Sequence, residues 1–230
     1  MYSKSSKTDT IVLKELERLG TKNIIVVGGQ DSITDTVLSN LDKLKYKVSR
    51  ISGVNRYDSS IKLAEKMLSE NNKERIILAS GENISDALTI SPYAAKNSTP
   101  IILLNKNTGS EQLLDLIKKY DIKTVDIIGG ENSVSNNIER KLSNLSKSLL
   151  VNRISGKNRF KTSEKIANKY FSNSENLFFT NPRNNIDTYV LGPIAARHNA
   201  PILFYNNSKD LKLGKNNILV GGDLTKESIK

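Results

Sequence analysis

A motif that occurs twice constrains the fold of this chain more than any other feature. It reads Arg-Ile-Ser-Gly-Val-Asn-Arg-Tyr over residues 50–57 and Arg-Ile-Ser-Gly-Lys-Asn-Arg-Phe over residues 153–160. Repetition at this distance indicates tandem copies of one structural unit. The motif therefore indicates a surface that is presented several times and not a single active site.

The similarity extends well beyond the motif. Residues 1–29 align without a gap to residues 102–130, and residues 86–103 align to residues 187–204. The copies predict three units. They are the C-terminal half of a first repeat (1–49), a complete second repeat (50–152) and a shortened third repeat (153–230).

The complete unit alternates strands with helices. Its helices have one apolar face, and its strands are short apolar runs, as in Arg-Ile-Ile-Leu-Ala at 75–79. Such alternation is typical of βαβ units with a parallel sheet covered on both faces. The expected strands are 46–51, 75–79, 101–104 and 124–128, and the expected helices are 59–69, 85–96, 110–120 and 134–145. The fold class is therefore α/β, with the first and last units incomplete.

The third repeat is expected to be damaged near its end. Only eleven residues lie between Tyr205 and Asn217, where the second repeat has a helix. A parallel crossover normally needs a dozen or more residues. A strand is still expected at residues 218–220, and a fragment of a longer protein would explain both incomplete repeats.

Composition limits the partners. The chain has 35 basic and 24 acidic residues, a net charge of +11. This surplus favours an anionic partner, although general solubility in a lysine-rich protein accounts for it too. No basic stripe is interleaved with aromatic residues, so nucleic-acid binding has little support.

Several classes of chemistry have no support in the sequence. Cysteine is absent and His198 is the single histidine, which excludes disulfides and cysteine-ligated metals and predicts no metal site or cofactor. No apolar run is long enough for a membrane span. No signal peptide is visible at the start of this chain.

Pairs of glycines follow strands at 28–29, 129–130 and 221–222. A strand, a glycine turn and a helix can hold a phosphate at the helix N-terminus. There is no third glycine at dinucleotide spacing and no Gly-Lys-Ser/Thr, so a tight turn is the favoured interpretation. Ser32 and Ser133 are expected to cap the helices that follow.

The arginines of the repeated motif have two interpretations. Arg50, Arg56, Arg153 and Arg159 either bind phosphate or carboxylate groups of a polymer or form ion pairs with Asp86 and Asp187. The ion pair is the favoured interpretation. The two aspartates begin the following helices and are expected to stabilise the helix dipole and not to act as catalytic groups. Pro92 and Pro193 predict a kink or a break in those helices.

In combination, these motifs resemble the cell wall binding repeat 2 family of clostridial cell wall and S-layer proteins. The resemblance rests on Arg-Ile-Ser-Gly, on the segment that begins at Asp86, on Pro-Ile-Ile-Leu-Leu and on Ile-Ile-Gly-Gly. It implies flavodoxin-like or Rossmann-like units in a pseudo-threefold arrangement. It also implies a secreted surface protein that is anchored noncovalently to an anionic wall glycopolymer.

The resemblance associates polymer attachment with an Ile-Leu-Leu motif, which corresponds to Ile102, Leu103 and Leu104 here. Leu203 and Phe204 stand at equivalent positions in the third repeat. Together with the four motif arginines they are the candidate polymer-binding residues, and no catalytic activity is expected. Two alternatives remain: an S-layer or self-associating assembly module, and a nucleotide-binding α/β enzyme that uses the glycine turns.

Overall fold

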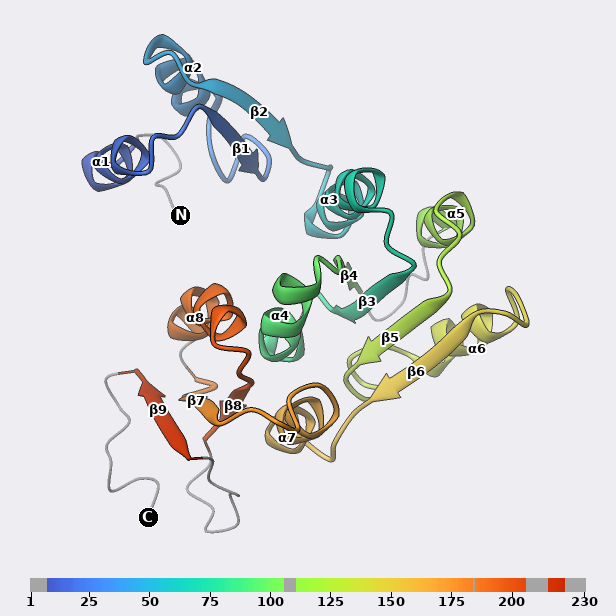
Figure 1. Ribbon diagram of the computed structural model, residues 1–230. Helices are drawn as coiled ribbons and strands as arrows, with labels where there is room; N and C mark the ends of the chain where they lie inside the picture. The colour runs from blue at the N-terminus through green and yellow to red at the C-terminus, as the bar shows by residue number, and fades with distance from the viewer. Residues whose placement is uncertain (1–7, 106–110, 184, 206–214, 222–230) are drawn as a thin grey trace. The chain divides into compact units, whose positions relative to one another are not determined.

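Strands alternate with helices along the chain, and each strand pair of the described residues is parallel (Figure 1). This confirms the α/β class that the sequence predicts. The computed structural model describes residues 8–105, 111–183, 185–205 and 215–221. The chain divides into two units, Met1–Leu63 and Ala64–Lys230, which are described in turn.

The first unit contains a two-stranded sheet with helices on one face. Its elements are α1 (Thr10–Arg18), β1 (Asn23–Val27), α2 (Asp35–Lys43), β2 (Lys47–Ile51) and the start of α3 (Arg56–Asn71). Leu16, Val37 and Leu41 form its small core. Ile25 and Val27 on β1 remain about half exposed. Within the first unit, one face of this two-stranded sheet is therefore only partly covered.

The second unit begins with the end of α3 and a four-stranded sheet in the order β4-β3-β5-β6. The elements are β3 (Arg75–Ser80), α4 (Ser85–Asn97), β4 (Ile101–Leu104), α5 (Glu111–Lys119), β5 (Thr124–Ile128), α6 (Asn136–Ser143) and β6 (Leu150–Ile154). Ile76, Ile77 and Leu78 are fully buried in succession. Side chains alternate between the faces of a strand, so both faces of this sheet are covered, as predicted.

A three-stranded sheet in the order β8-β7-β9 completes the second unit. Its elements are α7 (Arg159–Tyr170), β7 (Asn176–Thr180), α8 (Asn185–Arg197), β8 (Ile202–Phe204) and β9 (Asn216–Val220). Strand β9 pairs with β7 along its whole length, from Asn216 with Asn176 to Val220 with Thr180. The short connection before β9 thus does not prevent the parallel pairing, contrary to the expectation from crossover length. Residues 206–214 and Gly222 lie outside the described residues.

The sequence motif and the sheets have different boundaries. Strand β6 pairs with β5 and completes the four-stranded sheet, although Arg153 and Ile154 begin the third sequence repeat. Helix α7 then contacts β6, α4 and β8. Ile166 and Phe171 of this segment share a core with Ile77 of the four-stranded sheet. The copy of the motif at residues 153–160 therefore lies at the junction of the four-stranded and three-stranded sheets.

The prolines do not break their helices. Helices α4 and α8 run through Pro92 and Pro193, respectively. Proline has no N–H for the carbonyl four residues earlier, which for Pro92 is the carbonyl of Leu88. The Ser91 hydroxyl donates to this carbonyl at 2.8 Å and replaces the missing hydrogen bond.

Candidate functional site

The repeated motif forms a strand–turn–helix joint in both copies. In the second repeat, the Gly53 N–H donates to Ser59 Oγ at 2.9 Å and the Val54 N–H donates to Asp58 Oδ2 at 2.9 Å. In the third repeat, the Gly156 N–H donates to Thr162 Oγ1 at 3.0 Å. Side chains at the start of the following helix thus accept hydrogen bonds from the turn, and the hydroxyl group stands at the same position in both copies.

Each motif glycine is required by space. A Cβ atom on Gly53 would lie 2.2 Å from Asp58 Oδ2, and one on Gly156 would lie 2.4 Å from the carbonyl carbon of Lys161. Any larger residue would displace the start of the helix. The helix cap itself comes from the motif asparagine, because Asn158 Oδ1 accepts from the Lys161 N–H at 3.0 Å. Asn55 accepts from the N–H groups of Tyr57 and Asp58 in the same way.

The first arginine of each motif holds a glycine turn. Arg153 Nη1 donates to the carbonyls of Gly129 and Val134 at 2.8 and 3.0 Å, and its Nε donates to Glu139 at 2.7 Å. The side chain of Arg153 is only 14% exposed. The guanidinium is therefore engaged by the protein itself.

Arg50 repeats this arrangement in the first unit. Its guanidinium donates to the carbonyls of Gly28 and Ile33 and to Asp35 of α2. The carbonyl partners Gly28 and Ile33 occupy the same positions of the turn as those of Arg153. The ion pair predicted between Arg50 or Arg153 and the helix-opening aspartates is thus wrong. Each arginine reaches the glycine turn after the neighbouring strand and forms an ion pair with an acid on the helix that follows that turn, Asp35 of α2 or Glu139 of α6.

Asp86 lies beneath the glycine turn of the second repeat. A Cβ atom on Gly129 would lie 2.5 Å from Asp86 Oδ2, and the Ser133 hydroxyl donates to the same oxygen at 3.4 Å. Burial raises the pKa of Asp86 above its ordinary range, and the hydrogen bond from Ser133 and the positive charge of Arg159 partly offset this increase. Arg159, the second arginine of the motif at residues 153–160, is thus the one that interacts with Asp86.

Asp187 occupies the matching place in the third repeat, where a Cβ atom on Gly221 would lie 3.0 Å from Asp187 Oδ2. Both aspartates therefore pack against a glycine turn. Gly129 and Gly221 have positive φ angles of 106° and 129°, which confirms the tight-turn interpretation. The predicted serine caps are wrong, since Thr34 and Ser135 are the N-cap residues of α2 and α6.

The residues of the Ile-Leu-Leu motif lie on β4, at the edge of the four-stranded sheet. Ile102 and Leu104 are buried, with 0% and 2% exposure, and Leu103 is partly exposed. In the third repeat, Leu203 and Phe204 on β8 are both buried. The Ser163 hydroxyl of α7 accepts from the Phe204 N–H at 3.3 Å. Most of these side chains form core, and their contact with a polymer stays a prediction.

The second arginine of each motif has a different environment from the first. Arg56 and Arg159 are exposed, and Lys157 beside the third-repeat motif is exposed as well. The structure thus separates the four candidate arginines into two kinds. Arg50 and Arg153 hold turns, whereas Arg56 and Arg159 present positive charge at the start of α3 and α7.

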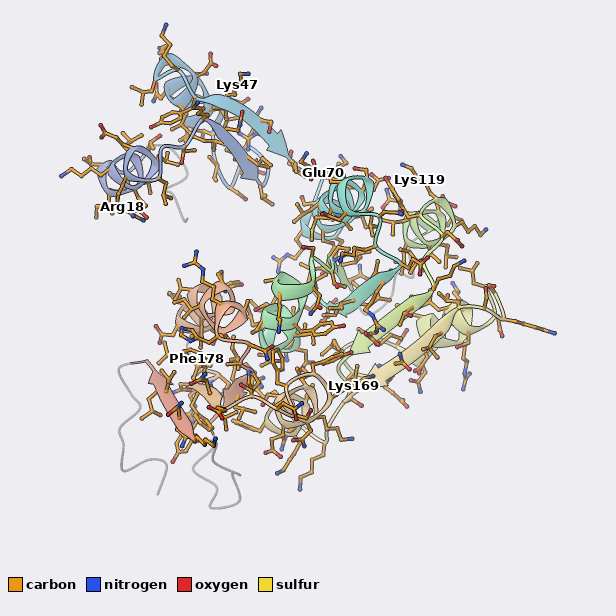
Figure 2. The ribbon with its side chains drawn as sticks, in the orientation of Figure 1. Arg18, Lys47, Glu70, Lys119, Lys169 and Phe178 are labelled. Atoms are coloured by element: carbon orange, nitrogen blue, oxygen red, sulfur yellow. The ribbon has the colours of Figure 1, made fainter. Side chains whose placement is uncertain are left out.

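Sequence reasoning missed a buried polar cluster on the four-stranded sheet. Asp126 of β5 is fully buried, forms an ion pair with Arg75 and accepts from Asn152 Nδ2 at 3.0 Å. Lys169 on α7 (Figure 2) has its Nζ 4.0 Å from Asp126 Oδ1. Burial, followed by the charge of Asp126, raises the pKa of Tyr170. The one indication of this cluster in the sequence is Asp126 itself, an aspartate inside the apolar strand Thr-Val-Asp-Ile-Ile.

Neither a metal site nor a transmembrane helix is evident in the described part of the chain. No group of three or more histidine, aspartate or glutamate side chains there is placed to hold a metal ion. No helix of the described residues combines the length and the apolar character that crossing a bilayer requires.

Taken together, the fold and the joint define a class of protein: tandem parallel α/β repeats linked by an arginine-containing turn. The family model for cell wall binding domain 2 matches residues 50–139 and 153–225. The chain therefore belongs to the cell wall binding domain 2 family. Each match begins at the first arginine of a repeated motif, Arg50 or Arg153.

Relatives share this region within longer proteins. The N-acetylmuramoyl-L-alanine amidase LytC of Bacillus subtilis (strain 168) is 27% identical over 219 residues, which are 95% of this chain and 42% of that protein. The amidase enhancer of the same organism is 32% identical over 192 residues, 83% of this chain and 25% of that protein. The chain thus spans less than half the length of these relatives.

The structure of Cwp8 from Clostridium difficile is similar as well. The two structures superpose with a TM-score of 0.85 at 26% sequence identity. The match covers 98% of this chain and 41% of the Cwp8 chain. The similarity extends across the α/β repeats and agrees with the family assignment. Cell wall binding is therefore the function that the family supports.

Proposed function

We propose that this chain anchors a surface protein noncovalently to the cell wall by binding an anionic wall polymer. The observation that carries the proposal is the recurrence of an exposed arginine, Arg56 and Arg159, beside a turn-holding arginine in each motif. Repeated cationic positions on one chain suit a polymer whose negative charges also repeat. The net charge of +11 adds a long-range attraction.

Repetition raises the strength of such binding. Each exposed arginine contributes little by itself, because an exposed charge pair is worth about 0.2–1 kcal/mol. Two weak contacts that engage the same polymer act at a high effective concentration, which increases overall binding by roughly 10²–10⁴-fold when both sites are reached. The proposed mechanism needs avidity and no catalytic group, and it locates the protein at the cell surface.

The nucleotide-binding alternative has physical arguments against it. In the second repeat, the carbonyl of Gly129 already accepts from Arg153, and the Asp86 carboxyl lies against the same turn. A phosphate group bound at this turn would meet that carboxyl in a poorly solvated place. The glycine turns are thus better suited to packing than to holding phosphate.

Sedimentation with purified cell walls tests the proposal. The variant Arg56→Gln/Arg159→Gln is compared with Arg18→Gln/Arg140→Gln, which removes the same charge from exposed arginines outside the motif. We expect the first variant to bind about tenfold more weakly than the second, because only its charges meet the polymer. Binding of the wild type should also fall as salt rises.

Two results would contradict the proposal. One is equal binding by both double variants. The other is retention that persists at high salt and on walls from which the anionic polymer has been extracted. Either would indicate that the wall is recognised through another surface or another component.

A further inference from the structure

Asp126 differs in kind from the residues at the same position of the other two repeats. The strand before the glycine pair reads Asn-Ile-Ile-Val-Val at 23–27, Thr-Val-Asp-Ile-Ile at 124–128 and Asn-Asn-Ile-Leu-Val at 216–220. Asp126 therefore corresponds to Ile25 and Ile218. Ile218 packs against the apolar core of the three-stranded sheet. An isoleucine thus satisfies the strand at this position, and the aspartate of the second repeat needs another explanation.

Asp126 lies on the face of the four-stranded sheet that α7 covers. Ile77 of β3 stands opposite Asp126 of β5, and paired residues of adjacent strands point to the same face of a sheet. Ile77 shares a core with Ile166 of α7. The aspartate is therefore enclosed between its own sheet and a helix of the following repeat, and its exposure is 0%.

The partners of this buried carboxylate come from both repeats. Within the sheet, Arg75 forms an ion pair with Asp126, and Asn152 Nδ2 donates to it at 3.0 Å. From α7, Lys169 brings its Nζ to 4.0 Å from Asp126 Oδ1 (Figure 2). Burial, followed by the charge of Asp126, raises the pKa of the adjacent Tyr170, so the end of α7 lies within the electrostatic field of the carboxylate.

The end of the equivalent helix changes in the same sense as the strand. Residues 66–68 of α3 read Lys-Met-Leu, and residues 169–171 read Lys-Tyr-Phe, so Met67 corresponds to Tyr170. Along the chain, Ile25 is followed by a helix that ends with methionine, and Asp126 is followed by a helix that ends with tyrosine. The strand position and the helix position thus change polarity together.

We propose that Asp126 selects the helix that docks on the four-stranded sheet: its carboxylate accepts the lysine and tyrosine end of α7 and rejects an apolar end. Repeat proteins carry equivalent elements in every unit, and docking of the wrong elements is a characteristic failure of their folding. An apolar end such as that of α3 would leave a buried charge short of partners, which is strongly unfavourable. Asp126 is thus a specificity-determining residue for the order of the repeats, and this role does not depend on wall binding.

A role in specificity predicts more than a loss of stability. Substitution of one member of a buried charge cluster destabilises most proteins, so the informative variant changes both positions together. Asp126→Ile introduces the residue of the other two repeats, and Tyr170→Met introduces the residue of α3. Isoleucine is larger than aspartate and methionine is smaller than tyrosine, so the double variant roughly conserves the volume of the pair.

Urea unfolding of the full chain compares the wild type, both single variants and the double variant. We expect each single substitution to lower the midpoint by about 1 M, and the double variant to recover about half or more of the summed loss. Asp126→Ile/Tyr120→Met is the matched control, because Tyr120 after α5, like Tyr170, has a lysine over its ring. The two losses in this control should add.

A disulfide reports the docking of the third repeat directly. Helices α4 and α8 lie side by side (Figure 1), and a Cβ atom on Gly192 would lie 3.5 Å from the Cβ atom of Ser91, a separation that a disulfide spans. The chain has no cysteine, so Ser91→Cys/Gly192→Cys carries a single reporter pair. We expect this pair to oxidise about tenfold more slowly when Asp126→Ile or Tyr170→Met is added alone, and at nearly the original rate when both are added.

Each outcome decides for or against the proposal. Circular dichroism shows which variants are folded, and if Asp126→Ile alone does not fold, a folded double variant is itself the recovery. Losses that add in the double variant, a double variant that does not fold, or equal oxidation rates in all backgrounds would overturn the proposal. Recovery by Tyr120→Met would contradict it too, because that residue is not part of the pair.

Discussion

Substitution of Arg153 separates the two roles assigned to the motif arginines. Arg153→Met keeps most of the aliphatic side chain and removes the guanidinium. The carbonyls of Gly129 and Val134 then lose their donors, and Glu139 loses its ion pair. We expect a large loss of stability and no loss of wall binding beyond that caused by unfolding.

The structure gives the magnitude of the loss. Removing one partner of a buried hydrogen bond costs about 1–3 kcal/mol, and Arg153 is 14% exposed. The pair with Glu139 adds at most about 1 kcal/mol, because the glutamate side chain remains partly solvated. Solvent can reach part of the turn after the substitution, so the total should be about 2–4 kcal/mol.

Urea unfolding provides the measurement. With an m-value of about 2 kcal/mol/M, the expected loss lowers the midpoint by about 1–2 M. The chain has no tryptophan and eight tyrosines, so circular dichroism and tyrosine fluorescence follow the transition. Arg159→Met is the comparison, and we expect it to shift the midpoint by less than about 0.5 M because its charge is exposed.

The reverse pattern would refute this reasoning. If Arg153→Met unfolds at the wild-type midpoint but binds walls poorly, the guanidinium acts on the polymer and not on the turn. If Arg159→Met is the less stable variant, the exposed arginine is the structural one. Arg153→Lys should recover only part of the loss, because an ammonium group cannot reach three acceptors in the geometry of a guanidinium.

Two further predictions concern the glycine turn. Gly129→Ala should lower the unfolding free energy by about 2–4 kcal/mol, because φ is 106° and the new Cβ atom would lie 2.5 Å from Asp86 Oδ2. Gly130→Ala is the control: its new Cβ atom would have no neighbour within 4 Å, so thermal denaturation should show almost no change. The raised pKa of Asp86 means that its contribution to stability is full below the ordinary aspartate range and is lost as pH rises through the folded pKa. Asp86→Asn should therefore gain stability relative to the wild type as pH rises through that window, in urea midpoints measured at several pH values, and a pH-independent difference would contradict this.

The element order could be predicted from the sequence because local signals and burial agree. The run at 75–79 is apolar throughout, and β3 occupies Arg75–Ser80 in the middle of a sheet covered on both faces. The expected helix at 85–96 is α4, Ser85–Asn97. In these segments the period of the apolar residues reflects what the fold buries.

The partners of side chains could not be predicted, because they depend on the register between distant strands. Arg153 reaches the turn after β5 only because β6 pairs beside that strand, with Ile128 opposite Ile154. The pattern placed two arginines near an acid in each repeat, but it could not tell which arginine would face a carbonyl. Asp126 shows the same limit, since its partner Arg75 comes from another strand.

The structure also changes which parts of the repeats are expected to contact the wall. Two pairs of recurring residues are used to build the fold: Arg50 and Arg153 hold the glycine turn after the neighbouring strand, and Gly53 and Gly156 permit the joint between strand and helix. The recurrence of these residues is thus explained by a packing requirement that each unit must meet. Polymer contacts need a residue that recurs and also reaches solvent. Among the motif arginines, Arg56 and Arg159 meet both conditions, so a loss of wall binding without a loss of stability should be sought there first.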